Sequence, residues 1–398
     1  MRIGMMADMY KPHVSGITNY VTLNKSYLEA AGHQVFVFTF GDTAYQDNEE
    51  HIICSPGLPI QDTGYYLNYR YSRHAKHLLQ SMDLVHVHHP FISGRLALRY
   101  CRPMRIPIVF TNHTRYDLYA QAYLPLLPEE ISASFLQSYM PSFCQAVDLV
   151  ISPSSGMARV LRQLGVDVPI EVIPNGVELQ RYQEACADCR PEFGFDRQDI
   201  ILVYSGRLAS EKNLEFLLRA FLGVADAVPA AHFLVIGGGP QEEALRQLAA
   251  QSVFPGRIHF TGMVPYDDLP RLLSMGDLFI TSSLTEVHPL SVIEAMASGL
   301  PALGIHSVGV GDTIEDGITG LLARDDMAAF TAKMTRLCLE KDLRRKMGLA
   351  ARTASRKYAI QNTVNMILDQ YERLLFNYQP QHKGLRYRLR SLVEKIRS

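Results

Sequence analysis

Short apolar runs alternate with amphipathic segments along most of the chain. In the first half the strand-length runs are RIGMMADM, QVFVFTF, MDLVHVHHP and IPIVFTNHT. The second half repeats the rhythm with DIILVYSGRL, HFLVIGGG and DLFITSS, separated by helical stretches such as NLEFLLRAFLGVADAV. Continuous apolar strands joined by helical connections are typical of parallel sheets that are covered on both faces. The pattern therefore predicts an α/β protein built of doubly wound sheets.

The length of 398 residues exceeds what one hydrophobic core supports, so we expect two domains. The strand series predicts an N-terminal Rossmann-like domain over 1–177 and a second one over 200–362. The polar stretch 178–199 is the expected linker, and 363–398 is expected to form a helix and a basic tail that cross back to the N-terminal domain. We expect the two domains to face each other across a cleft, with ligands bound beyond the carboxyl ends of the strands.

Composition excludes several classes of protein. The chain is 47% hydrophobic and 20% charged with a net charge of −1, so it is not a nucleic-acid binder by overall charge. Its apolar runs are far shorter than the ~20 residues of a membrane-spanning helix, and its N-terminus has no signal-peptide pattern. Six cysteines are scattered, and the CADC motif at 186–189 has no second pair. We expect reduced thiols in a cytoplasmic protein and no zinc site.

Charge is nevertheless segregated along the chain. The segment 377–398 holds six Lys and Arg against one acid, and the segment 63–82 combines four tyrosines with three Lys and Arg and no acid. Basic and aromatic residues together suit the headgroup region of an anionic membrane. A solvated helix in the tail and a nucleic-acid patch at 63–82 are alternatives that composition alone does not separate.

Two strand-end loops could hold an anion. The first, YKPHVSG at 10–16, places Gly16 at the start of a helix, where free N–H groups face a ligand. The second, SGRLASEKN, carries Arg207 and Lys212 at a strand-to-helix junction. Two cations so placed suit a diphosphate, unless Glu211 neutralises one of them. The nearby VIGGGP turn is not GxGxxG, which argues against a dinucleotide-dependent oxidoreductase.

The stretch SLTEVHPLSVIEAMASG places two acids around a helix start. Pro289 suits the first position of that helix, so the N–H groups of Leu290 and Ser291 should be free. Glu286 then lies on the preceding loop, and Glu294 lies one turn inside the helix. A helix start that receives phosphate, flanked by acids that receive hydroxyls, indicates a nucleotide-sugar site. The alternative is an exposed loop acid and a surface or capping acid.

The motifs YKPHVSG, VIPNGVE, SGRLASEKN, VIGGGP, FTGMVP and EVHPLSVIEAMASGLP follow one another in one order. Together they resemble the retaining glycosyltransferase family four, which has the GT-B fold, over roughly residues 1 to 370. The resemblance implies that Arg207 and Lys212 hold the donor diphosphate and that Glu294 holds the ribose. It implies that Glu286 contacts the transferred sugar, and it adds these donor-site residues: Gly16, His113, Gly238, Val264, Leu290 and Ser291.

One departure concerns the residues after the first glutamate. Many members carry Phe-Gly where this chain has His288-Pro289, which changes the sugar pocket and leaves the donor open. The resemblance implies a metal-independent, front-face transfer with His113, Arg207, Lys212 and Glu286 as the catalytic set, and no cofactor. We interpret His86 and His88, two residues apart in a buried strand, as packing residues and not as metal ligands.

The segment TNHTRYDLYAQAYLP suggests the acceptor. It resembles bacterial diacylglycerol glucosyltransferases, so Tyr116, Tyr119 and Tyr123 are candidate acceptor contacts. The predicted reaction is transfer of glucose from UDP-glucose to 1,2-diacylglycerol by an enzyme peripheral on the inner face of the cell membrane. The alternatives are a phosphatidylinositol mannosyltransferase using a GDP-sugar, a soluble transferase acting on a sugar or metabolite, and a non-catalytic nucleotide-binding protein. The sequence does not fix the oligomeric state.

Overall fold

The computed structural model describes residues 1–13, 15–42, 49–59, 66–118, 129–184 and 189–378. The chain forms two compact units. The first unit comprises Met1–Asn175 together with Ile360–Ser398, and the second comprises Gly176–Ala359. The C-terminal segment therefore belongs to the same unit as the N-terminus.

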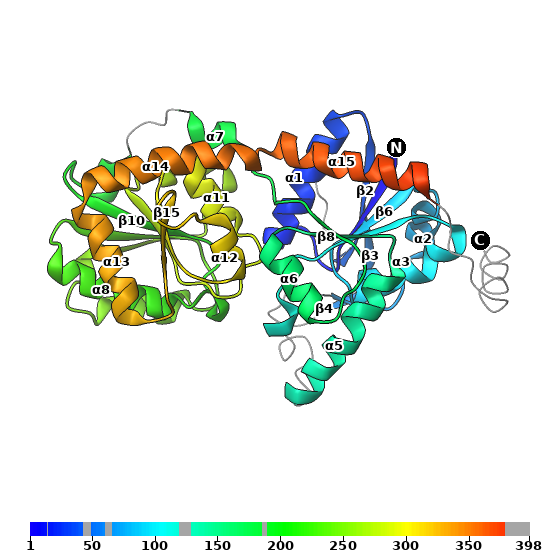
Figure 1. The fold of residues 1–398 in the computed structure, drawn as a ribbon, viewed down its shortest axis with the longest axis horizontal. Helices are drawn as coiled ribbons and strands as arrows, with labels where there is room; N and C mark the ends of the chain where they lie inside the picture. The colour runs from blue at the N-terminus through cyan, green and yellow to red at the C-terminus, as the bar shows by residue number, and fades with distance from the viewer. Residues whose placement is uncertain (14, 43–48, 60–65, 119–128, 185–188, 379–398) are drawn as a thin grey trace. The chain divides into compact units, whose positions relative to one another are not determined.

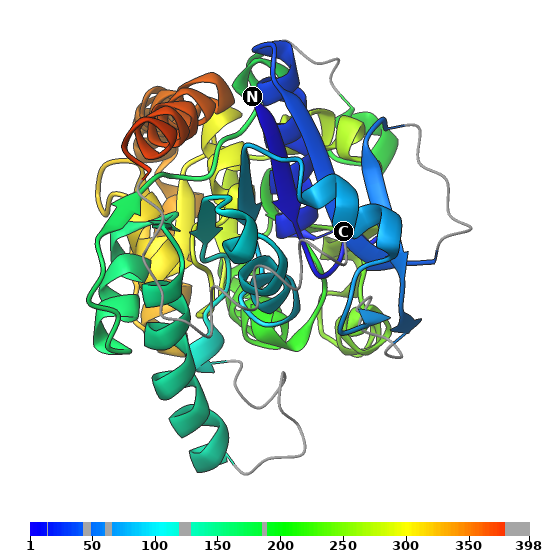
Figure 2. The ribbon, with the colours of Figure 1, turned by 90° about the vertical axis from the view of Figure 1, so that its right-hand side faces the viewer.

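The first unit is built on a parallel sheet of order β3-β2-β1-β6-β7-β8-β9 (Figures 1 and 2). A short antiparallel pair, β4 (Leu58–Pro59) and β5 (Tyr66–Leu67), lies outside it. The strands of the main sheet are β1 (Arg2–Met6), β2 (Gln34–Gly41), β3 (Ile52–Pro56), β6 (Leu84–Val87), β7 (Ile108–Thr111), β8 (Leu149–Ser152) and β9 (Ile170–Val172).

Helices connect these strands and cover the sheet. They are α1 (Gly16–Ala30), α2 (Arg73–Leu79), α3 (Ile92–Tyr100), η1 (Arg102–Met104), α5 (Glu129–Ala146), α6 (Ser155–Gln163) and α15 (Ile360–Asn377).

The C-terminal helix α15 is part of the first unit's core. Its buried residues Ile360, Val364, Ile367 and Tyr371 recur at helical spacing and pack in one cluster with residues of α1 and β1. The hydroxyl of Tyr371 lies 2.5 Å from His86 Nδ1 on β6. This buried hydrogen bond fixes the helix to the centre of the sheet.

The second unit has a parallel sheet of order β12-β11-β10-β13-β14-β15. Alternate residues of the central strand enter the two cores: Leu202 packs in the cluster on one face and Val203 in the cluster on the other. The strands are β10 (Ile200–Ser205), β11 (Ala231–Ile236), β12 (Ile258–Gly262), β13 (Leu278–Thr281), β14 (Ala302–Ile305) and β15 (Gly320–Ala323).

Both faces of this sheet are covered, which explains why its strands read as unbroken apolar runs. The helices of the second unit are α7 (Leu179–Gln183), η2 (Arg190–Phe193), η3 (Ser210–Lys212), α8 (Leu214–Ala227), α9 (Glu242–Ala250), η4 (Pro255–Arg257), η5 (Tyr266–Asp268), α10 (Leu269–Leu273), α11 (Leu290–Ala297), α12 (Val308–Thr313), α13 (Met327–Leu339), α14 (Lys341–Ser355) and η6 (Arg356–Tyr358).

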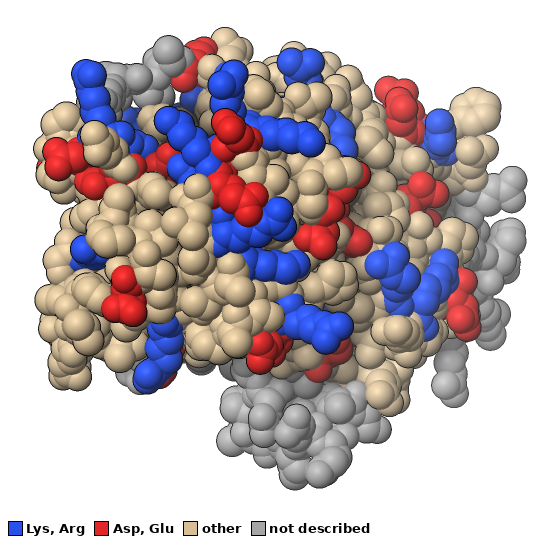
Figure 3. Space-filling model, turned by 60° about the vertical axis from the view of Figure 1, so that its left-hand side comes forward, with Lys and Arg blue, Asp and Glu red and all other residues tan. Residues whose placement is uncertain are grey.

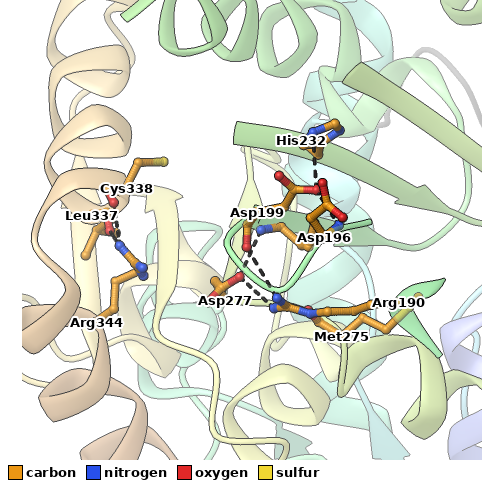
Figure 4. Close-up of polar contacts among 10 residues, drawn as sticks. Arg190, Asp196, Asp199, His232, Met275, Asp277, Leu337, Cys338 and Arg344 are labelled. Atoms are coloured by element: carbon orange, nitrogen blue, oxygen red, sulfur yellow. Dashed lines mark hydrogen bonds and ion pairs between the residues drawn. The ribbon is translucent and has the colours of Figure 1, made fainter. Parts of the chain in front are cut away.

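The segment expected to be a linker, 178–199, packs within the second unit wherever the structure describes it. Leu179, Tyr182 and Phe195 are buried in one of its two cores. Arg190 donates to the carbonyl of Met275 at 2.7 Å and to Asp277 Oδ2 at 2.8 Å (Figure 4). Most of the polar side chains of this stretch are exposed, whereas a few apolar residues and the Arg190 hydrogen bonds tie it to the second unit. Cys186 of the CADC motif lies outside the described residues.

The prediction of two doubly wound parallel sheets is confirmed. In each sheet the strand order reverses beside the first strand, between β1 and β6 in the first unit and between β10 and β13 in the second. Ligands of open α/β sheets bind at such switch points. In the described part of the chain, no helix is both long and apolar enough to cross a membrane.

Candidate active site

The loops that follow β10 and β13 meet at the switch point of the second sheet. The first loop carries Arg207 and Lys212, and the second carries Glu286 and leads into α11. Lys212 Nζ lies 2.6 Å from Glu286 Oε1, and both side chains are largely buried. The structure therefore brings together two of the predicted site residues, from positions 74 residues apart in sequence.

This ion pair decides the charge of Glu286. Burial acts to raise the pKa of its carboxyl group, but the charge and hydrogen bond of Lys212, with a hydrogen bond from Ser283, outweigh burial and lower that pKa below its ordinary value. Glu286 is therefore ionised at neutral pH. The carboxylate that pairs with Lys212 is that of Glu286.

Hydrogen bonds from the side chain of Ser282 to the main chain hold the two loops together. Ser282 Oγ donates to the carbonyl of Lys212 at 3.0 Å and to that of Asn213 at 2.8 Å. Asn213 adopts the left-handed conformation, with φ of 54°, and so ends η3 and turns the chain into α8. Lys212 is thus fixed at its backbone as well as at its ammonium group.

The Glu286 loop is fixed by the start of α12. The N–H of Gly309 donates to the carbonyl of Glu286 at 3.0 Å. A Cβ atom at position 309 would lie 2.5 Å from that same oxygen, so the backbones approach too closely for any other residue. The carboxylate of Glu286 is therefore aimed by a contact to its own main chain.

Glu294 is held separately, one turn inside α11. It is 5% exposed, and Tyr266 donates a hydrogen bond to its Oε1 at 2.9 Å. Burial raises the pKa of Glu294 to about 6, and the hydrogen bond from Tyr266 opposes that rise. The guanidinium of Arg181 lies 5.4 Å from the Tyr266 ring centroid. Glu294 is thus a buried acceptor and not the surface or capping acid of the alternative interpretation.

The start of α11 presents backbone donors between the two acids. The helix begins at Leu290, with Pro289 as its cap, one residue later than predicted. Its first turn has no acid and no side-chain cap, so the N–H groups of Leu290 and Ser291 are available to an anion. His288 is buried against Tyr358, with ring centroids 5.0 Å apart, and burial lowers its pKa to about 4.

The glycine turn after β11 supports the Arg207 loop. The carbonyl of Gly238 accepts from the N–H of Leu208 at 2.9 Å. At Gly237, with φ of 128°, a Cβ atom would collide with the carbonyl oxygen of Gly206. This close backbone approach explains the GGG sequence. The Arg207 side chain is exposed. Val264 is partly buried and packs against the core cluster of the second unit that contains Val203.

In the first unit, Gly16 begins α1 at the end of the loop after β1. Ser15 caps this helix by accepting from the N–H of Thr18 at 3.1 Å. Gly16 itself is exposed, with no atom within 4 Å of the position its Cβ would take. This arrangement leaves room for a ligand beside the helix start.

His113 belongs to a cluster of histidines at the ends of β6 and β7. Its Nε2 lies 3.0 Å from His88 Nδ1, and its ring packs edge-on against Tyr20 with centroids 4.6 Å apart. Burial, with the charges of His86 and His89 as smaller contributions, holds the pKa of His113 well below its ordinary value. His113 is therefore a neutral imidazole at pH 7, and Nδ1 remains for a ligand, since it has no hydrogen-bond partner among the described residues.

His86 and His88 are both fully buried, with ring centroids 4.3 Å apart. His86 is also engaged at its second nitrogen, since Nε2 lies 2.7 Å from Thr111 Oγ1. Among the residues that the structure describes, no group of three or more His, Cys, Asp or Glu side chains is arranged to hold a metal ion.

Of the three candidate acceptor tyrosines, the structure describes Tyr116. Tyr116 is 2% exposed and packs edge-on against Phe91, with centroids 5.2 Å apart. Its ring is therefore a core element in this structure. Tyr119 and Tyr123 lie outside the described residues.

Sequence reasoning found the charged residues of the site and missed the groups that position them. Tyr266, Ser282 and Gly309 fix Glu294, Lys212 and Glu286 respectively. Tyr266 lies outside the motifs that indicate the site, and a serine hydroxyl that bonds a distant carbonyl leaves no periodic pattern. The two glycines of GVGDT, Gly309 and Gly311, are the sequence signal that could have indicated a close backbone approach here.

Two family models match the chain and together span most of it. "Glycosyltransferase Family 4" matches residues 14–181, and "Glycosyl transferases group 1" matches residues 187–354. The chain belongs to this glycosyltransferase family. The boundary between the two matches falls close to the division between the two compact units. The resemblance inferred from the strand-end motifs is thereby confirmed.

Two curated relatives carry the same description. The chain is 29% identical over 334 residues to "Alpha-monoglucosyldiacylglycerol synthase" of Streptococcus pneumoniae, covering 81% of this chain and 75% of that protein. It is 26% identical over 335 residues to the enzyme of that name from Acholeplasma laidlawii, covering 81% and 84%. The solved structure of HepE from Anabaena in complex with UDP-glucose superimposes with a TM-score of 0.72 at 20% identity, covering 94% of this chain and all of that one. These comparisons establish a GT-B glycosyltransferase.

The contact between Gly309 and the Glu286 carbonyl makes a structural prediction. Gly309→Ala should lower the thermal unfolding midpoint of the enzyme, because overpacking of this kind costs about 1–3 kcal/mol. Gly311→Ala, in the same helix, is the matched control. Its Cβ would meet nothing closer than His306 Nε2 at 3.4 Å, and alanine favours the helix. Differential scanning calorimetry of both variants should show a loss only at position 309; equal midpoints would contradict the close contact.

Proposed function

We propose that this glycosyltransferase transfers glucose from UDP-glucose to 1,2-diacylglycerol at a membrane surface, with retention of the anomeric configuration. The observation that carries the donor half of this proposal is the Lys212–Glu286 pair beside the uncapped start of α11. The acceptor half rests on the two relatives described as monoglucosyldiacylglycerol synthases.

The donor diphosphate would be held by Arg207, Lys212 and the N–H groups at the start of α11. These groups supply positive charge and preorganised donors on one side of the site. Glu294, buried and held by Tyr266, would accept the hydroxyl hydrogens of the ribose. The binding of UDP-glucose by the structurally similar HepE supports a UDP-sugar donor.

Glu286 would accept hydrogen bonds from hydroxyls of the transferred sugar. Its carboxylate is engaged with Lys212 at 2.6 Å and is fixed by its own carbonyl, so it is an orienting group and not a mobile nucleophile. In the proposed front-face transfer, the bond from the anomeric carbon to the diphosphate breaks as the acceptor hydroxyl attacks from the same side, and the proton of that hydroxyl passes to the departing diphosphate oxygen. Lys212 and Arg207 stabilise the charge on the departing diphosphate, and no metal is required.

His113 would contact the donor sugar as a neutral hydrogen-bonding group. Its low pKa means that it does not bring a positive charge to a transition state that itself resembles an oxocarbenium ion. With Nε2 engaged by His88, the Nδ1 atom is the one that can face a hydroxyl.

A transfer assay tests this proposal. The enzyme is incubated with radiolabelled UDP-glucose and diacylglycerol in phosphatidylglycerol vesicles, with EDTA present. We expect a labelled α-glucosyl lipid, and we expect Arg207→Ala to reduce kcat/KM by about a hundredfold or more, equivalent to about 3 kcal/mol. Arg219→Ala, an exposed arginine paired with Glu215 on α8, is the control and should retain full activity.

The outcomes separate the parts of the proposal. Hydrolysis of UDP-glucose without lipid product would preserve the donor site and overturn the lipid acceptor. A glycolipid product formed from GDP-mannose and not from UDP-glucose would contradict the proposal that UDP-glucose is the donor. Activity that EDTA abolishes and Mg²⁺ restores would contradict metal independence.

The raised pKa of Glu294 predicts how donor binding depends on pH. Above about pH 6 the carboxylate is ionised and accepts ribose hydroxyls, so UDP-glucose should bind more weakly as pH falls from 7.5 to 5. The folding stability of the free protein depends on pH in the opposite sense. The raised pKa of Glu294 stabilises the folded state fully below pH 4.5, and this stabilisation is lost as the pH rises through about 6.

Isothermal titration with UDP-glucose measures this dependence directly, since the diphosphate diester does not titrate in this range. Glu294→Gln should bind about tenfold more weakly at pH 7.5, because a charge-assisted hydrogen bond contributes about 1.5–3 kcal/mol. The variant should also lose the pH step. Glu243→Gln, an exposed acid on α9, is the control. The same pH step in Glu294→Gln and wild type would contradict the assignment.

A further inference from the structure

The exposed face of α14 is rich in Lys and Arg. Its exposed positions Lys341, Arg345, Leu349 and Arg352 recur at intervals of four, four and three residues, so they lie on one side of the helix. Lys346 is exposed beside them, and Asp342 is the one acid of the helix. Figure 3 shows Lys and Arg side chains (blue) interspersed with acids (red) over the upper part of one side of the molecule.

These cations differ from those on neighbouring helices of the same unit. Arg219 on α8, Arg246 on α9 and Arg336 on α13 each lie within 2.8 Å of a glutamate four residues away. By contrast, no described acid forms an ion pair with Lys341, Arg345 or Lys346. Like charges four residues apart, as at 341 and 345, destabilise a helix slightly. The α14 face therefore keeps a positive charge that the other helices neutralise locally.

The inward side of α14 fixes which face is exposed. Arg344 is buried and donates to the carbonyl of Leu337 at 2.7 Å, and it also contacts the carbonyl of Cys338, at the end of α13 (Figure 4). At Gly348 a Cβ atom would collide with the carbonyl oxygen of Gly299, just after α11. Because α14 packs this closely on the helix that carries Glu294, its cationic face cannot turn inward.

Exposed leucines accompany the charge. Leu349 is 61% exposed in the middle of the cationic face, and Leu339, the last residue of α13, is 66% exposed two positions before α14 begins. Apolar side chains set among Lys and Arg suit the headgroup region of a bilayer, where leucine enters the acyl boundary while the cations remain with the phosphates. Binding to single-stranded nucleic acid would favour exposed aromatic rings for base stacking, and the exposed apolar residues of this face are leucines.

We propose that the exposed face of α14, centred on Arg345, Lys346 and Leu349, docks the second unit onto an anionic lipid surface. The surface is distinct from the segments 63–82 and 377–398 that the composition indicated. It deepens the proposed function, since a lipid acceptor requires the enzyme to work at a bilayer, but docking itself requires only anionic headgroups. Each Lys or Arg near such a surface strengthens binding, and the effect falls with added salt.

Vesicle co-sedimentation of the full-length enzyme tests this docking without substrate. Vesicles contain phosphatidylcholine alone or an equal mixture with phosphatidylglycerol, and neither contains diacylglycerol. We expect wild type to bind the anionic vesicles and Arg345→Glu/Lys346→Glu to bind them at least about tenfold more weakly. Leu349→Ser should bind several-fold more weakly, and its remaining affinity should be more sensitive to salt.

The charge-matched control is Arg219→Glu/Arg246→Glu, which makes the same change in net charge on α8 and α9. It should bind vesicles like wild type, and UDP-glucose titration should show an intact donor site in every variant. An equal loss of vesicle binding in the control and in the α14 variant would show that net charge alone determines binding, and it would overturn the proposal. Wild-type binding that survives the α14 reversal would also overturn it, as would binding to polyuridine in place of vesicles. Because diacylglycerol is absent, these outcomes are independent of the acceptor in the transfer assay.

Discussion

The ion pair between Lys212 and Glu286 is the interaction on which the second unit's site depends. It joins the loop after β10 to the loop after β13, and these are the two strands at which the order of the sheet reverses. The pair keeps Glu286 ionised although its side chain is largely buried, because the nearby ammonium outweighs the cost of desolvation. It also gives the partly buried ammonium group of Lys212 a counter-charge within hydrogen-bonding distance.

Backbone proximity provides the rigidity that this pair requires. Gly309 approaches the Glu286 carbonyl, and Gly237 approaches Gly206 beside the Arg207 loop, so closely that a side chain at either glycine would separate the segments. The same device recurs where Gly348 of α14 meets Gly299 after α11. A series of close contacts thus extends from the donor loops through α11 to the helix whose outer face is cationic. Glu294, on α11, differs from Glu286 in having tyrosines and not a cation as its partners, so its pKa rises while that of Glu286 falls.

Much of this arrangement follows from the sequence, for identifiable reasons. Parallel strands buried on both faces produce unbroken apolar runs, so DIILVYS and DLFITSS predict the sheet, and charged residues just after such runs are already placed at its carboxyl edge. The contact of Lys212 with Glu286 was not predicted, because it depends on which strands are neighbours, and strand order is not written in local patterns. Residues 178–199 resemble a linker because most of their polar side chains are exposed; what ties them to the second unit is a few buried apolar residues, such as Leu179 and Phe195, and the hydrogen bonds of Arg190. The role of Tyr116 as an acceptor contact stays a prediction: it rests on the likeness of TNHTRYDLYAQAYLP to bacterial diacylglycerol glucosyltransferases, and in this structure the ring packs against Phe91.

A double-mutant cycle on UDP binding tests the central role of the ion pair most directly. Lys212→Met should bind UDP much more weakly than wild type, since it removes a cation and leaves the Glu286 charge facing the diphosphate. Adding Glu286→Gln removes that repulsion, so the double variant should bind UDP more tightly than Lys212→Met alone, with a coupling energy of about 1–3 kcal/mol. UDP lacks the sugar, so no contact between Glu286 and a hexose enters the cycle. Strictly additive effects of the two substitutions would show that Lys212 and Glu286 act independently and would contradict this account.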